Sequence, residues 1–232
     1  LIMKGFGENR HFKQNIKKKK ENSILFFKKG IELHLKGNLK DAMKYYEYCI
    51  KGGLKDSKLY SNYAFTLRSC GKLDEALNYF QLSINLRPND TNVLYNFGAT
   101  LNSLGKFSEA EVVLQKALKL EPDHIEAYNL LAFILYYLRK EEEAEKLLHK
   151  AIKKRPNYAR TYHNLARILI ASKKLKQAEL YQRKAIELKP DYPEALFGLG
   201  TILQELGNLR QAENCYLKTI ETKSDYVPPY YE

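Results

Sequence analysis

The sequence predicts an all-α solenoid of six helix-turn-helix repeats, because small residues recur along it with one fixed period. Alanines spaced 34 residues apart are the clearest signal: Ala42, Ala76, Ala110, Ala144, Ala178 and Ala212. A second small residue, Gly or Ala, recurs at the eighth position of each copy. Periods of about 20–50 residues mark chains built from stacked copies of one supersecondary unit. Such a chain forms a long surface rather than a pocket around one catalytic centre.

The repeats are placed by setting the first to begin at Ser23. Six copies then cover residues 23–56, 57–90, 91–124, 125–158, 159–192 and 193–226. Residues 1–22 form a basic leader, which we expect to be flexible, and residues 227–232 begin a truncated seventh repeat. We expect the C-terminal stacking face to be exposed, as in a fragment of a longer protein or at an oligomer contact.

Small residues at repeat positions 8 and 20 let the two helices of each hairpin approach closely, while bulky residues at positions 4 and 11 fill the grooves beside them. Glycine at position 15 predicts a left-handed end to the first helix, and proline at position 32 ends the second. The glycines are Gly37, Gly71, Gly105 and Gly207, and the prolines are Pro88, Pro122, Pro156 and Pro190.

Two details of these turns give further expectations. The residue after each proline is Asn or Asp, which we expect to cap the next helix; these are Asn89, Asp123, Asn157 and Asp191. Arg139 and Lys173 replace the turn glycine in the fourth and fifth repeats. Because a side chain is disfavoured in the left-handed conformation, we expect those two turns to relax.

Composition narrows the class of protein. Hydrophobic residues make up 44% of the chain, enough for a continuous core. Three cysteines without CxxC spacing indicate small buried or partly buried side chains in a reducing compartment. The longest apolar run, residues 130–138, is too short for a membrane span, and the N-terminus has no apolar signal stretch. The sequence therefore predicts a soluble cytoplasmic protein.

The net charge of +12 is unevenly placed, because residues 1–22 hold seven Lys/Arg and two Glu. A solvated leader is one interpretation. Binding of nucleic acid or of an anionic membrane surface through the leader is the alternative.

The repeats resemble the tetratricopeptide repeat (TPR), and the resemblance covers residues 23–226. It implies a right-handed superhelix whose concave face is lined by the first helix of each pair. No glycine-rich phosphate loop, HExxH, paired CxxC or nucleophile elbow is present, and the five histidines are scattered. We therefore expect no enzymatic activity, no cofactor and no metal site.

Asparagines at the sixth repeat position are the first candidate for binding. Asn62, Asn96 and Asn164 occupy it, while Leu130 and Gly198 interrupt the row. An Asn side chain can pair with a peptide unit through both its acceptor and its donors. The surrounding triplets are similar to those in the TPR region of O-linked N-acetylglucosamine transferases, where the matching asparagines hold a bound polypeptide. The alternative is that they are ordinary surface residues.

Aromatic residues and one arginine accompany this row, a composition typical of binding hot spots. The alternative for Phe133 and Tyr137 is packing between adjacent repeats. The set of lysines and asparagines that makes a carboxylate clamp in chaperone-binding TPR domains is not clearly present. The predicted peptide-binding residues are Asn62, Phe65, Tyr95, Asn96, Asn129, Phe133, Tyr136, His163, Asn164 and Arg167.

The leading functional prediction is a scaffold that binds an extended peptide or a partner helix in its concave groove. The alternative is that the chain is the substrate-docking region of a larger glycosyltransferase or sulfotransferase, as the resemblance to bacterial TPR-containing enzymes of these classes implies. We expect protein or peptide partners, with self-association through the exposed last repeat as a further possibility. Nucleic acid is a minor alternative, and a membrane partner is not expected.

Overall fold

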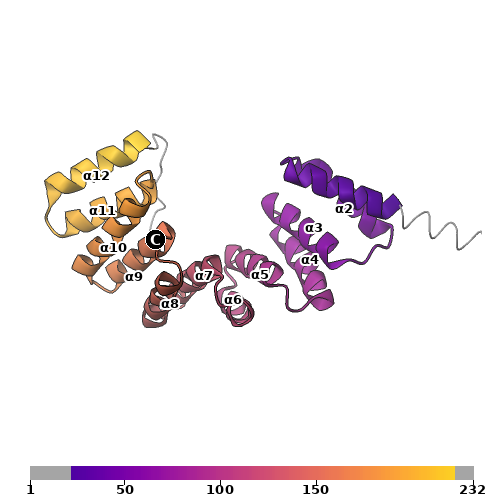
Figure 1. Cartoon of the computed structure of the whole chain (residues 1–232), viewed down its shortest axis with the longest axis horizontal. Helices are drawn as coiled ribbons and strands as arrows, with labels where there is room; N and C mark the ends of the chain where they lie inside the picture. The colour runs from indigo at the N-terminus through magenta and orange to yellow at the C-terminus, as the bar shows by residue number, and fades with distance from the viewer. Residues whose placement is uncertain (1–21, 223–232) are drawn as a thin grey trace, which may run out of the picture. The chain divides into compact units, whose positions relative to one another are not determined.

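A computed structural model describes residues 22–222, whose regular elements are all α-helices (Figure 1). Residues 22–35 are helical, and the helices that follow are α2 (Leu39–Lys51), α3 (Ser57–Ser69), α4 (Leu73–Leu86), α5 (Thr91–Ser103), α6 (Phe107–Leu120), α7 (Ile125–Tyr137), α8 (Glu141–Lys154), α9 (Ala159–Ala171), α10 (Leu175–Leu188), α11 (Pro193–Glu205) and α12 (Leu209–Thr222). The predicted basic leader, apart from Asn22, and the start of a seventh repeat lie outside the described residues.

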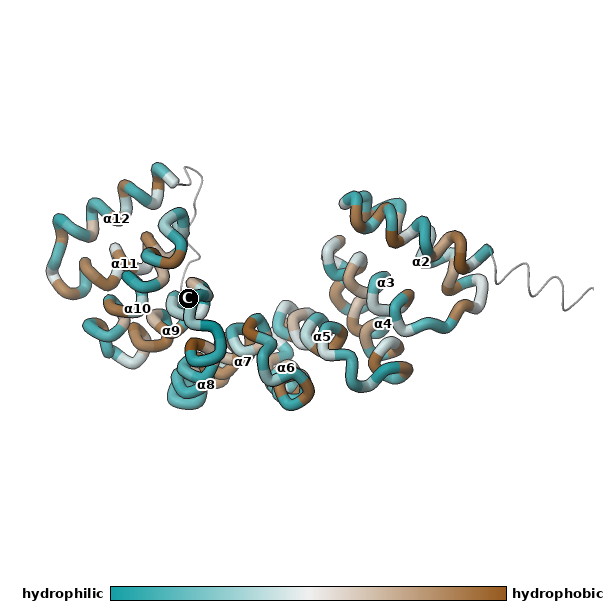
Figure 2. Tube along the Cα trace, in the orientation of Figure 1, coloured by the Kyte–Doolittle hydropathy of each residue, from teal (hydrophilic) through white to brown (hydrophobic). Residues whose placement is uncertain are grey.

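The odd-numbered helices from α3 onward begin at the residues where the repeats were set to begin. Each is 13 residues long, and the second helix of each pair has 13 or 14 residues. The second helices end two residues or so before each proline, because the residue before a proline is disfavoured in helical geometry. Hydrophobic and hydrophilic residues alternate along the helices (Figure 2). None of the helices in the described part is long and apolar enough to cross a membrane.

The chain divides into two compact units, unit 1 up to Lys106 and unit 2 from Phe107 onward. Within unit 2, each helix from α6 to α12 packs on the next, and α9 also contacts both α7 and α11. The second helices α8, α10 and α12 make no such contacts with one another in the described part. The first helices therefore line the inner side of this unit. We call the surface formed by α7, α9 and α11 the inner face of unit 2.

The predicted close approach of the two helices is confirmed at the alanine positions and at position 8. The six alanines are at most 2% exposed. A Cβ added to Gly30 would lie 2.7 Å from the Tyr46 ring, and one added to Gly200 would lie 2.5 Å from the Tyr216 ring. Glycine is thus required where a tyrosine packs across the hairpin, and this is the packing that position 8 was predicted to allow.

The turn between paired helices has one geometry in all six repeats, so the expectation that two of them relax is wrong. Arg139 and Lys173 have φ values of 60° and 58°, close to those of the turn glycines. The Lys140 N–H donates to the Leu135 carbonyl at 2.8 Å, as the Lys72 N–H does to Leu67 at 2.9 Å in a glycine-containing turn. This bond pattern closes the helix end, and it holds both side chains in the left-handed region.

The predicted capping residues are also wrong by one position. The N-cap of α5 is Asp90, whose side chain accepts from the Val93 N–H at 3.1 Å, and the N-cap of α7 is His124. Proline and the residue after it occupy the turn itself, which moves the cap one residue further along. The Asp123 carboxylate instead forms an ion pair with the Lys154 ammonium group at 2.7 Å.

The cysteines agree with the prediction only in part. Cys49 is buried and donates to the Ser23 carbonyl, and Cys215 is partly buried, but Cys70 is exposed at the end of α3. No two of them pair as a disulfide.

Candidate functional site

In unit 1 the predicted residues form a short chain of ring and amide contacts. The Phe65 ring stacks on His34 with centroids 5.3 Å apart, and the Arg68 guanidinium lies 5.3 Å from the same ring. Arg68 also donates to Asn96 Oδ1 at 3.2 Å. The Asn62 side chain makes no hydrogen bond with the described residues. The amides of Asn62 and Asn96 therefore differ in how much of their bonding capacity remains for a ligand.

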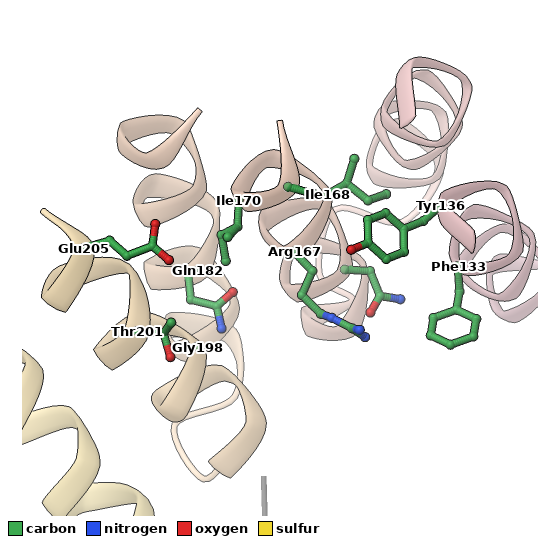
Figure 3. A pocket seen from close by; sticks show the side chains of 11 residues that line it. Phe133, Tyr136, Arg167, Ile168, Ile170, Gln182, Gly198, Thr201 and Glu205 are labelled. Carbon is green, nitrogen blue, oxygen red and sulfur yellow. The ribbon is translucent and has the colours of Figure 1, made fainter. Parts of the chain in front are cut away.

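In unit 2 the inner face contains a hollow of about 280 Å³, which we call the apolar hollow (Figure 3). Tyr136 and Arg167 extend from α7 and α9 into the same space between these helices. The Arg167 guanidinium lies 5.8 Å from the Phe133 ring centroid. The lining residues are Phe133, Tyr136, Asn164, Arg167, Ile168, Ile170, Ala171, Gln182, Gly198, Thr201 and Glu205.

A second hollow of about 640 Å³ adjoins it toward the start of α9 and α11, and we call it the cationic hollow. It is lined by three basic side chains and one carboxylate, so its charge is positive. Asn164 and Arg167 line both hollows. The lining residues are Asn157, Tyr158, Ala159, Arg160, His163, Asn164, Arg167, Leu188, Lys189, Tyr192 and Glu194.

Asn164 is held in place by a buried neighbour. Its Nδ2 donates to Asn129 Oδ1 at 2.8 Å. Asn129 in turn donates to the Ile125 carbonyl at 2.9 Å and to Thr161 Oγ1 at 3.0 Å. Both N–H groups and the oxygen of the Asn129 amide are thus used inside the protein, whereas Asn164 keeps its Oδ1 and one N–H for a ligand.

His163, which lines the cationic hollow, and Gln182, which lines the apolar hollow, form a second buried polar pair. Gln182 Nε2 donates to the Ala195 carbonyl at 2.7 Å and lies 3.0 Å from His163 Nδ1. Because the Gln182 amide nitrogen can only donate, His163 accepts through Nδ1. Burial, with the charges of Arg167 and Arg160 acting in the same direction, lowers the pKa of His163 to about 4.

The structure brings together four of the predicted residues, Phe133, Tyr136, Asn164 and Arg167, at the apolar hollow. Asn129 and His163 are only 4% and 8% exposed, so they support the surface more than they form it. Phe65, Tyr95, Asn62 and Asn96 belong to unit 1. The roles of all ten in binding remain predictions.

Three residues that line the cationic hollow were not among the predicted binding residues: Arg160, Lys189 and Tyr192. They occupy repeat positions 2, 31 and 34 of one repeat and meet where the first turn of α9 lies beside the turn that leads into α11. Lys189 Nζ lies 4.8 Å from the Tyr192 ring centroid. Comparing charge at these positions across repeats could have found them, since only this repeat pairs two basic residues with a tyrosine there. In the described residues no group of His, Cys, Asp and Glu side chains could hold a metal ion.

Comparison with protein families gives three matches. Residues 60–161 match the middle TPR-like domain of cilia and flagella-associated protein 70, and residues 159–192 and 181–214 match the tetratricopeptide repeat. Comparison with curated protein sequences gives no match.

Solved structures of TPR proteins are similar to the chain. MamA from Desulfovibrio magneticus RS-1 is 26% identical with a TM-score of 0.64, over 72% of this chain and 95% of that one. PilW, a type IV pilus biogenesis factor, is 19% identical with a TM-score of 0.77, over 88% and 94%. YrrB, described as a TPR protein with an unusual peptide-binding site, is 20% identical with a TM-score of 0.58, over 78% and 93%.

These matches confirm the predicted all-α solenoid of helix-turn-helix repeats. They name no glycosyltransferase or sulfotransferase, so the likeness to the TPR regions of those enzymes stays a prediction. The models of tetratricopeptide repeats together match residues 60–214, which agrees with the repeated hairpins and supports the interpretation that this part of the chain is built from such repeats.

Proposed function

We propose that the chain is an interaction scaffold that binds an extended peptide across the inner face of unit 2. The observation that carries the proposal is Asn164, because its amide is fixed from below by Asn129 and still has an acceptor and a donor to offer. One acceptor and one donor on a single side chain match the N–H and C=O of a peptide unit. A scaffold that pairs with the backbone can hold peptides of varied sequence.

The surroundings of Asn164 support the same proposal. Aromatic and aliphatic side chains of α7 and α9 lie on one side of it and basic side chains on the other. Side chains of these kinds, Tyr and Arg above all, contribute most to the affinity of protein interfaces. YrrB, which shares the fold, carries a peptide-binding site in the words of its own description.

The test begins with selecting peptides from a displayed random library on the full chain. Their affinities are then measured by calorimetry for the unmodified protein and for Asn164→Ala. Losing the amide should weaken binding about fivefold to tenfold, because one hydrogen bond contributes about 1 kcal/mol, or somewhat more where it is shielded from water.

Asn214→Ala is the matched control, since Asn214 is an exposed asparagine on α12, outside both hollows. It should leave the affinity unchanged. The proposal fails if no peptide is selected, or if the selected peptides bind Asn164→Ala as tightly as they bind the unmodified protein.

A further inference from the structure

Two adjoining hollows on the inner face of unit 2 differ in chemistry, and this difference restricts the peptide that fits them. That restriction rests on the proposed function above and specifies the class of peptide that is bound. Asn164 and Arg167 line both hollows, so a single ligand that lies along α9 contacts both.

Two of the three basic side chains of the cationic hollow have no carboxylate partner among the described residues. Elsewhere in unit 2, Lys154, Lys174 and Arg183 each pair with a carboxylate within 2.8 Å. Arg160 and Lys189 take part in no ion pair with the described residues. Lys189 lies over the ring of Tyr192 instead, and Arg160 forms a side-chain hydrogen bond with Tyr192. Glu194 is the one carboxylate in the lining, so Arg160 and Lys189 alone leave an excess of positive charge.

The apolar hollow offers a different surface. Phe133, Tyr136, Ile168 and Ile170 supply aromatic and aliphatic side chains to its lining. Glu205 lies among the α11 residues of the lining and is its one carboxylate. A large apolar side chain gains free energy by leaving water for such a site.

The spacing of the two hollows along the helices sets the spacing on the ligand. On α9 the cationic hollow is lined from Ala159 to Arg167, and the apolar hollow from Asn164 to Ala171. The middles of these two stretches are four to five residues apart, which at about 1.5 Å of rise per helical residue is about 7 Å. An extended peptide covers that distance in about two residues, and side chains two residues apart point to the same face of an extended chain.

We infer that this face binds an acidic peptide whose carboxylate lies about two residues from a large aromatic or aliphatic side chain. The carboxylate binds between Arg160 and Lys189, the apolar side chain enters the apolar hollow, and Asn164 pairs with the backbone between them. Charge complementarity thus selects an acidic partner over a neutral or basic one.

The experiment uses the full chain and a panel of synthetic fluorescent peptides. The parent peptide has a Gly/Ser background with a pair of Asp residues and one Phe two residues further along. Companions replace Asp by Asn or by Lys, replace Phe by Ser, or change the spacing. The parent should bind at least tenfold more tightly than the Asn and the Ser companions, and its affinity should fall as salt is added.

A charge exchange separates a binding role from a structural one. The double variant Arg160→Glu and Lys189→Glu should lose the parent peptide and gain the companion that carries Lys. A merely structural defect would weaken both. The matched control is Lys176→Glu with Arg210→Glu, which are exposed basic residues of α10 and α12 outside both hollows.

Each other outcome has a definite meaning. If Asn and Lys peptides bind as tightly as the parent, the inference is overturned while peptide binding stands. If no peptide of any charge binds and library selection also fails, the proposed function falls with it. If a single-stranded oligonucleotide competes for the site and binds more tightly than the parent peptide, the positive charge serves nucleic acid and the inference is again overturned.

Discussion

His163 is a buried histidine that the protein holds neutral by surrounding it with Gln182, Tyr192 and two arginines. Its Nδ1 accepts from Gln182, so a proton added there would face an N–H donor. The Tyr192 ring lies 5.2 Å from it, which leaves little access for water. Arg160 and Arg167 further disfavour the charged form.

Stability should therefore fall in mild acid. The folded-state pKa of His163 is about 4, below the unfolded value near 6.5, so the unfolded chain takes up the proton first. The stabilisation is complete above pH of about 6.5 and is lost as pH falls toward 4, by about 2 kcal/mol between pH 7 and pH 5. Urea unfolding at a series of pH values measures the free energy of unfolding. His163→Gln should flatten the decline over this range, and an equally steep decline in the variant would contradict the assignment.

The burial of a side chain could be predicted from the sequence where its surroundings repeat, and it could not be predicted where they do not. Ala144 and Ala178 were predicted to be in the core because every repeat has the same contact there. Asn129 was predicted to bind peptide but is buried, and Gln182 was not among the predicted residues, since partners of both come from other helices of this one region. Their burial depends on a hydrogen-bond network that no period reveals.

At the scale of the element, the turn after each first helix imposes one conformation whichever residue occupies it. A Cβ at Gly207 would meet nothing within 4 Å, so the cost of a side chain there comes from backbone conformation alone. The same cost is present in the protein at Arg139 and Lys173.

Replacing these residues by glycine should stabilise the protein. Arg139→Gly and Lys173→Gly should each raise the free energy of unfolding by about 1 kcal/mol, through release of left-handed strain. Gly207→Ala should lower it by a similar amount. Thermal and urea unfolding report these changes, and a destabilised Arg139→Gly would show that its side chain contributes contacts that outweigh the strain.

The contact between the two helices of a hairpin gives another prediction at this scale. Gly200 faces Tyr216, whereas the equivalent pair in the fourth repeat is Ala132 and Leu148, both fully buried. Gly200→Ala should cost about 1–3 kcal/mol by overpacking. Adding Tyr216→Leu should recover most of that loss by recreating the Ala–Leu pair. Calorimetric melting of the two variants decides it, and a double variant as unstable as the single one would contradict it.

Element boundaries followed from the sequence because glycine and proline fix them by backbone geometry alone. The first helices begin at Thr91 and Ile125 as expected. The caps were missed by one residue, since the turn that contains the proline is itself one residue longer than expected. The cationic hollow was missed because Arg160 and Lys189 lie 29 residues apart and become neighbours only through the packing of α9 on the turn before α11.

For the molecule as a whole, the repeat provides a surface along which side chains can vary while the core stays constant. α12 is the last helix of the described part, and its apolar side chains are more exposed than their equivalents: Ile220 is 58% exposed, whereas Ile152 and Ile186 are partly buried. Self-association through this face stays a prediction.

Sedimentation at increasing protein concentration tests that prediction. The average mass should rise for the unmodified chain and stay constant for Leu217→Lys with Ile220→Lys, because burial of apolar surface would drive the association. Leu180→Lys, an equally exposed leucine on α10, is the control and should behave as the unmodified chain does. A constant mass for the unmodified chain would remove the prediction.

The central claim, that the inner face of unit 2 holds a peptide, is tested most directly by backbone amide NMR of the full chain. A peptide that binds is added, and the shifted amides are mapped onto the helices. We expect the shifts to gather on α7, α9 and α11, with Asn164, Arg167 and Gly198 among the largest. Shifts confined to the outer helices α8, α10 and α12 would contradict the account.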